Sequence, residues 1–212
     1  MPATSRKTLR LIKRYESGER SPELIQALNE AAWDGFHDPW EPPPAGKEVV
    51  VKEGGAAMDP ETIQPFTLDT IERLLKRKEI SYWRSDQKTF LVFLGYDQDS
   101  DRCLRSSHAV EGKNECIYCL RVVGDRRVDA KDYGRARELC DKWNGSYRWP
   151  RAYLEIPTLA DGAGVPASGL LVLDYQLDLE KGIHQSLFDD LVEGAVFASF
   201  SFWKMAKEEF GL

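Results

Sequence analysis

The 212-residue sequence has no long apolar segment and no excess of positive charge. A membrane-spanning helix needs about 20 apolar residues, whereas the longest run without a charged residue, residues 162–173, is interrupted by a proline. The first 30 residues lack the apolar stretch of roughly 7–15 residues that a secretion signal has. The net charge of -6 argues against a nucleic-acid binder, because such proteins usually carry a basic excess. We therefore expect a cytoplasmic protein that neither spans a membrane nor binds nucleic acid.

Cysteine is scarce, and its pattern allows one metal-binding hypothesis. Cys103, His108, Cys116 and Cys119 give the spacing C-x4-H-x7-C-x2-C, which has the ligand types and number that zinc takes. However, Cys116 and Cys119 lie within CIYCLRVV, which has the pattern of a strand, and strand residues three apart point to opposite faces. We therefore interpret the cysteines as small core residues, expect no cofactor, and keep zinc as the alternative. Thiols in a cytosolic protein stay reduced, so no disulfide framework is expected.

The sequence also lacks the local motifs of catalysis. Asp97, Asp99 and Asp101 resemble the start of a calcium loop, but the sixth and twelfth positions hold Arg102 and His108 instead of the required Gly and Glu. No G-x-S-x-G marks a nucleophile, and no glycine pattern fits a phosphate cradle. We therefore predict a protein that is not an enzyme.

Composition divides the chain into three parts. Residues 1–36 read as a helical extension, and Ser21 and Pro22 are suited to begin its second helix. Residues 37–64 are rich in Pro and Gly, as linkers are, and residues 65–212 form the main domain. The helical extension has a narrow apolar seam, made by Leu24, Leu28, Trp33 and Phe36.

The main domain has the alternating patterns of an α+β fold. We expect helices over residues 68–78, 129–144 and 185–210, and strands over residues 80–84, 89–96, 115–123, 152–156 and 171–179. Asn144-Gly145 is a common helix stop. Residues 97–114 are polar, and only Cys103 and Leu104 could extend a strand there. The predicted order is α-β-β-β-α-β-β-α, with about five antiparallel strands covered by helices.

A cluster of aromatic and basic residues follows the second predicted helix. Trp, Tyr and Arg are enriched at binding hot spots, and they can also stack on single-stranded bases, which the net acidity disfavours. The alternative is a structural corner that joins helix and strand. The candidate partner-binding residues here are Trp143, Tyr147, Arg148, Trp149 and Arg151.

The last predicted helix is apolar on nearly all sides. Its main stripe contains Leu187, Leu191, Ala195, Ala198 and Phe202, whereas Phe197, Phe200 and Trp203 lie beside the stripe. Three exposed rings would leave more apolar surface in water than a monomer usually tolerates. We therefore include these three residues among the partner-binding candidates. The cover would be a second copy of the chain, the helices of residues 5–36, or a client protein.

Three segments carry a resemblance to a known family: TLDTIERLLKRKEISYW, ELCDKWNGSYRWPRAYLE and LLVLDYQLDLEKGI. Residues 65–212 resemble the YbjN-domain proteins, also called bacterial sensory transduction regulators. The resemblance implies a type III secretion chaperone-like fold and no catalytic residues; residues 1–60 lie outside it, and residues 97–114 are longer than it requires. We predict a non-enzymatic bacterial protein that binds another protein in a regulatory or chaperone-like role. The alternative is a metal-dependent sensor or enzyme that uses the Cys103, His108, Cys116 and Cys119 set.

Overall fold

The computed structural model describes residues 62–85, 87–157 and 168–212, all within one compact unit, Gly46–Leu212. The helical extension predicted for residues 1–36, and nearly all of the linker predicted for residues 37–64, lie outside the described residues. The helices are α3 (Leu68–Arg77), the short η1 (Ala130–Asp132), α4 (Tyr133–Ser146) and α5 (Gln185–Phe210). The strands are β1 (Tyr82–Arg84), β2 (Thr89–Asp97), β3 (Arg102–Glu111), β4 (Ile117–Gly124), β5 (Val128–Asp129), β6 (Arg151–Glu155) and β7 (Ser168–Asp178).

The seven strands of the described residues belong to one antiparallel sheet, so the predicted α+β class is confirmed. Strands β1, β2, β3 and β4 pair in chain order, and β7 then pairs with β4. Strands β6 and β5 both pair with β7 in antiparallel register. Of the connection between β6 and β7, residues 158–167 lie outside the described part.

The prediction failed for β3, which was read as part of a polar stretch and is in fact a central strand. Its sequence, RCLRSSHAVE, lacks the apolar alternation that indicates a half-buried strand. Its central polar side chains satisfy one another instead: His108 bonds Ser106 Oγ at 2.9 Å and the hydroxyl of Tyr118, on β4, at 2.8 Å. Hydrogen bonding of this kind makes burial of polar residues tolerable.

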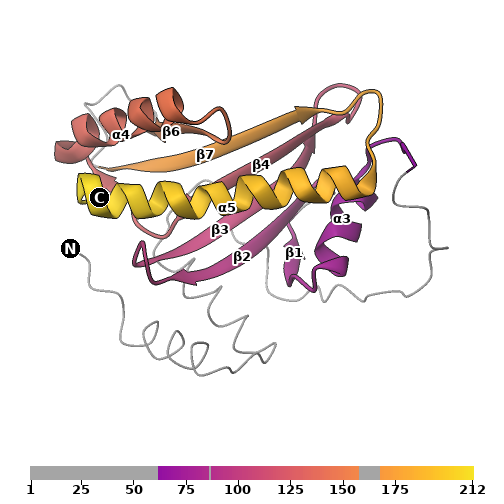
Figure 1. Cartoon of the computed structure of the whole chain (residues 1–212), viewed down its shortest axis with the longest axis horizontal. Coiled ribbons are helices and arrows are strands. Elements are labelled where there is room, and N and C mark those ends of the chain that lie inside the picture. The colour runs from indigo at the N-terminus through magenta and orange to yellow at the C-terminus, as the bar shows by residue number, and fades with distance from the viewer. Residues whose placement is uncertain (1–61, 86, 158–167) are drawn as a thin grey trace. The chain divides into compact units, whose positions relative to one another are not determined.

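The three longer helices lie on one face of the sheet, with α5 running across it (Figure 1). The main core lies between these helices and the sheet, where Leu104, Leu120 and Leu173 of the strands meet Phe188 and Phe202 of α5. Helix α5 has the predicted bounds, but its buried stripe is rotated from the predicted one. Leu187 is 47% exposed and Leu191 half-buried. The buried positions are Gln185, Phe188, Asp189, Val192, Ala195, Ser199, Phe202, Trp203 and Ala206.

Polar contacts join α3 to the first turns of α5. The Arg73 Nε donates to Gln185 Oε1 at 2.8 Å, and the Gln185 amide donates to Asp189 Oδ1 at 2.9 Å. Arg77 forms an ion pair with the buried Asp189, and Lys78 forms one with Glu193. These contacts hold α3 against the first turns of α5.

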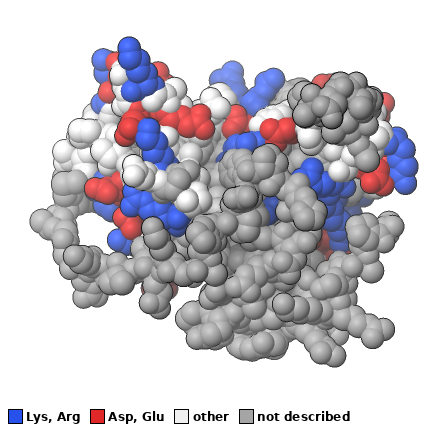
Figure 2. Space-filling model, turned by 180° about the vertical axis from the view of Figure 1, so that it is seen from behind, with Lys and Arg blue, Asp and Glu red and all other residues white. Residues whose placement is uncertain are grey.

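We call the opposite side of the sheet the helix-free face, because none of the described helices lies on it. Figure 2, seen from behind, shows side chains of both charges interspersed over the described part of this side. The strand register and the alternation of side chains assign both apolar and polar residues to this face: Leu91, Phe93, Cys103, Arg105, Ser107, Cys119, Arg121, Val123, Arg151, Tyr153, Glu155, Leu170, Val172, Asp174 and Gln176.

Candidate functional site

The corner between α4 and β6 is held by two side chains of the W-N pair. Trp143 is fully buried, and its indole N–H donates to the carbonyl of Pro150 at 2.7 Å. Asn144 bonds both backbone groups of Ala152, donating to its carbonyl at 2.8 Å and accepting from its N–H at 2.9 Å. The amide of Asn144 thereby pairs with β6 as a neighbouring strand would. Gly145 is helical, so the predicted stop at Asn144-Gly145 was wrong; α4 ends at Ser146.

The same corner presents an aromatic and basic surface, which we call the corner surface and define as Tyr147, Arg148, Trp149 and Arg151. Tyr147 is 44% exposed and stacks on Trp143, with ring centroids 4.1 Å apart. Trp149 is 50% exposed, and its inner edge meets the ring of Tyr175, a residue of β7 on the helix side. Arg148 and Arg151 are exposed. The predicted cluster therefore divides: Trp143 is the structural part, and the other four residues face solvent.

The three rings of α5 that were predicted to need a cover have different environments. Phe197 is 70% exposed and Phe200 is half-buried. Trp203 is fully buried, packed edge-on against Phe202 and beneath the guanidinium of Arg102 at 5.2 Å. The prediction that Trp203 needs an outside cover was therefore wrong, because the first residue of β3 and the sheet already cover it. Of the three rings, Phe197 is the one most open to a partner.

The helix α4 connects the corner surface to α5. The ring of Trp143 meets Phe202 edge-on at 5.4 Å, and Arg135, two turns earlier, donates to the carbonyl of Phe210. The two helices therefore run antiparallel, and the end of α4 that carries Tyr147 points toward the middle of α5. Trp149 and Phe197 lie on the helix side of the sheet, whereas Arg151, which precedes the core residue Ala152 on β6, points to the helix-free face.

The proposed zinc ligands do not converge. In the register of β3 and β4, His108 faces the helices beside Leu120, whereas Cys119 pairs with Ala109 and faces the other way, as Cys103 does. Among the described residues, no three His, Cys, Asp or Glu side chains come together in a group that could hold a metal. Burial raises the pKa of Cys103 and of Cys119 to about 12, so both thiols carry their protons at neutral pH.

His108 is a structural residue of the core in this arrangement. Burial lowers its pKa to about 4, which keeps the imidazole neutral between Ser106 and Tyr118. A neutral imidazole has one donor and one acceptor nitrogen, and each has a hydroxyl to meet. Sequence reasoning missed this role, and it also missed Asn144, whose position directly after a helix-terminal Trp was the available signal.

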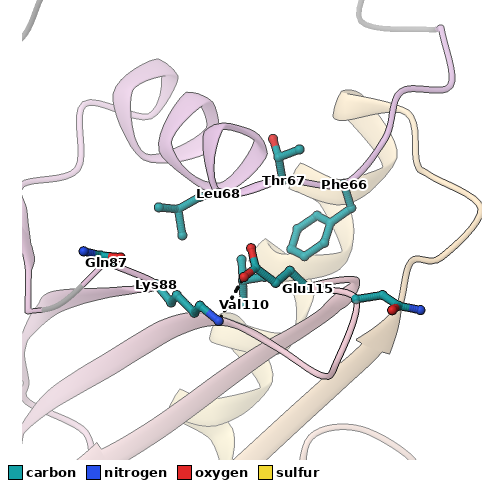
Figure 3. A pocket seen from close by; sticks show the side chains of 8 residues that line it. Phe66, Thr67, Leu68, Gln87, Lys88, Val110 and Glu115 are labelled. Carbon is teal, nitrogen blue, oxygen red and sulfur yellow. Dashed lines mark ion pairs between the residues drawn. The ribbon is translucent and has the colours of Figure 1, made fainter.

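A small pocket of about 230 Å³ lies between the start of α3 and the sheet (Figure 3). Phe66 and Leu68 reach from the start of α3 toward Val110 of β3, and Lys88 and Glu115 form an ion pair of 2.9 Å between their side chains. The remaining lining residues are Thr67, Gln87 and Asn114. The lining holds no histidine or cysteine, and its two charged side chains, Lys88 and Glu115, are paired with each other.

The fold and the site define a class of protein: an α+β domain whose most distinctive surface is a fixed aromatic corner. Residues 67–198 match a family model described as "YbjN: Putative bacterial sensory transduction regulator". Because the match covers more than half of the 212 residues, the chain belongs to the YbjN family, as its sequence resemblance implied. The family is described as one of regulators, with no reaction named.

A solved structure with the same fold is described as "Crystal structure of YbjN, a putative transcription regulator from E. coli". It is 13% identical to this chain, with a TM-score of 0.51, and the match covers 69% of this chain and 94% of that one. At this identity the likeness concerns the fold alone. No curated protein matches the chain. Within the described residues, no helix is long and apolar enough to cross a membrane.

Proposed function

We propose that the chain is a non-enzymatic regulator that binds a partner protein through the corner surface, with Phe197 as a second contact. The family description supports the regulatory role at a general level. The observation that carries the proposal is the half-exposed ring of Trp149, which stands in a corner fixed by Trp143 and Asn144. A ring held in place before binding loses little conformational entropy when a partner covers it.

The chemistry of the corner surface favours a protein partner. Trp, Tyr and Arg are the residues most often found at interface hot spots, and here they occur within five consecutive positions. A nucleic-acid partner would need a wider basic surface, which the net charge of -6 does not favour. The partner surface that fits best is apolar at its centre, where it would meet Trp149, and acidic beside it, where it would meet Arg148 and Arg151.

The test is capture of partners from the native cell by the full chain and by a Trp149→Ala variant. Removal of a hot-spot ring costs about 2 kcal/mol or more of binding free energy, so a specific partner should be lost or weakened at least about 30-fold. The matched control is Leu187→Ala, which removes an exposed apolar side chain outside the corner surface. A partner that is purified and binds both variants as tightly as the wild type would contradict the proposal.

A further inference from the structure

The outward side of α5 carries an exposed ring that none of the described helices covers. Phe197 is 70% exposed, and neither α3 nor α4 crosses this side of α5 (Figure 1). Gly194 and Ser201, three residues before it and four residues after it, lie on the same side of the helix and are small and exposed. A Cβ added at Gly194 would meet no side chain of another element within 4 Å. Another helix can therefore approach α5 closely beside the ring of Phe197.

Two opposite charges flank this ring at equal distances along the helix. Asp190 lies seven residues before Phe197, and Lys204 lies seven residues after it. Seven residues are close to two full turns, so the three side chains form one line along the helix. Both charged residues are exposed. Lys204 pairs with Asp99 at 3.3 Å and with Glu208 at 3.9 Å, but surface ion pairs contribute little, so it can turn to another carboxylate.

An acid, a ring and a base in this order are complementary to a second copy of the same helix that runs antiparallel. With a two-fold axis at Phe197, Asp190 of each copy faces Lys204 of the other copy, and the two rings meet beside small residues. A parallel partner would instead place each acid against an acid. The two-fold arrangement also closes the assembly at two copies.

We propose that α5 pairs with α5 of a second copy of this chain, antiparallel, about a two-fold axis at Phe197. The proposal does not involve the corner surface. A contact made mainly by one helix from each copy is at the small end of protein interfaces, which are weak and transient, so the dimer should form at micromolar or higher concentration. Phe197 is covered in the dimer, and the second contact described above is open to another protein in the monomer. Self-association therefore competes with that contact.

The first test is the association of the full chain, measured by analytical ultracentrifugation from about 1 to 500 μM, the range of weak complexes. Phe197→Ala removes a ring from each side of the axis, so it should weaken association at least about 30-fold. The matched control is Tyr153→Ala, which removes an exposed ring on the helix-free face and should dimerise as the wild type does. A wild type that is monomeric at every concentration, or a Phe197→Ala variant that dimerises equally well, would overturn the proposal.

Charge exchange tests the register of the two helices. Asp190→Lys places like charges opposite each other on both sides of the axis, and so does Lys204→Asp, so each should weaken association at least about fivefold. The double variant Asp190→Lys, Lys204→Asp restores opposite charges across the axis, and its dissociation constant should return to within about threefold of the wild-type value. Single variants that dimerise as the wild type does, or single effects that add in the double variant, would overturn the proposal.

Cross-linking tests the direction of the two helices. A mixture of Asp190→Cys and Lys204→Cys chains should be joined by a short bifunctional thiol reagent, because the two new thiols face each other across the interface. Neither variant alone should be joined, because its two copies lie about 21 Å apart along the helix axis. The wild type is the blank, since its own thiols are buried or half-buried. Cross-linking of Asp190→Cys alone, or none in the mixture, would overturn the proposal.

Discussion

Truncation of the two tryptophans of the corner should cost very different amounts of stability. Trp143→Ala removes a fully buried indole, an edge-on contact with Phe202 and the stack on Tyr147. A large-to-small change in a core costs about 3–5 kcal/mol, and the carbonyl of Pro150 also loses its hydrogen-bond donor, at about 1–3 kcal/mol. We expect a loss of at least about 4 kcal/mol, or roughly 8–16 °C in Tm for a domain of this size.

Trp149→Ala should cost far less stability, because half of that ring already faces water and its one ring contact is with Tyr175. We expect about 1 kcal/mol. Urea unfolding followed by circular dichroism measures both variants on one scale. A Trp149→Ala variant as unstable as Trp143→Ala would refute the division of the corner into a structural and an exposed part.

Three further predictions concern the core, the junction of the helices and the linker. Burial lowers the pKa of His108 from 6.5 to about 4, so as pH falls between these values the unfolded chain gains a proton that the folded chain does not. Stability should then decrease by up to roughly 3 kcal/mol. In urea titrations at several pH values, His108→Gln should lose this part of the pH dependence. The same dependence of stability on pH in the variant would contradict the assignment of His108 as a buried neutral residue. Asp189→Ala removes the buried acceptor of Gln185 and the partner of the half-exposed Arg77. It should lower the free energy of unfolding by about 1–3 kcal/mol in the same assay. No change would show that the α3–α5 contacts do not contribute to stability. Limited proteolysis should cut within residues 38–64 and leave a folded core, because Pro and Gly disfavour regular structure there; a core that begins elsewhere would refute this boundary.

The sequence predicted the elements whose patterns are strong. Helix α5 and strand β2 were placed within one residue, because long apolar patterns and clear ends mark them. Strand β3 was missed because the burial of its polar residues depends on another strand: His108 bonds Ser106 of β3 itself and the hydroxyl of Tyr118 of β4. The rotation of α5 was also missed, because Phe188 and Val192 are as apolar as Leu187 and Leu191. Such a pattern does not specify which side meets the sheet.

The position of the candidate site could be predicted from the sequence, but which of its residues are buried and which are exposed could not. The density of Trp, Tyr and Arg between Trp143 and Arg151 indicated the corner. Which ring is buried depends on the carbonyl of Pro150 and on the ring of Tyr175, and the second of these lies on another strand. The sequence also suggested that Trp203 is exposed. Arg102, which covers its ring, is about a hundred positions away in the chain, so the pattern of α5 alone does not show this contact.

The most direct test of the central claim is a hydrogen-exchange comparison of the full chain alone and in complex with a purified partner. Amide exchange slows where a partner covers the backbone or stabilises local structure. Our account predicts that the partner slows exchange over residues 147–153, the loop and strand that carry Trp149, and near Phe197 on α5. Protection confined to other regions, such as the pocket formed by Phe66, Leu68 and Val110, with no change over residues 147–153, would contradict it.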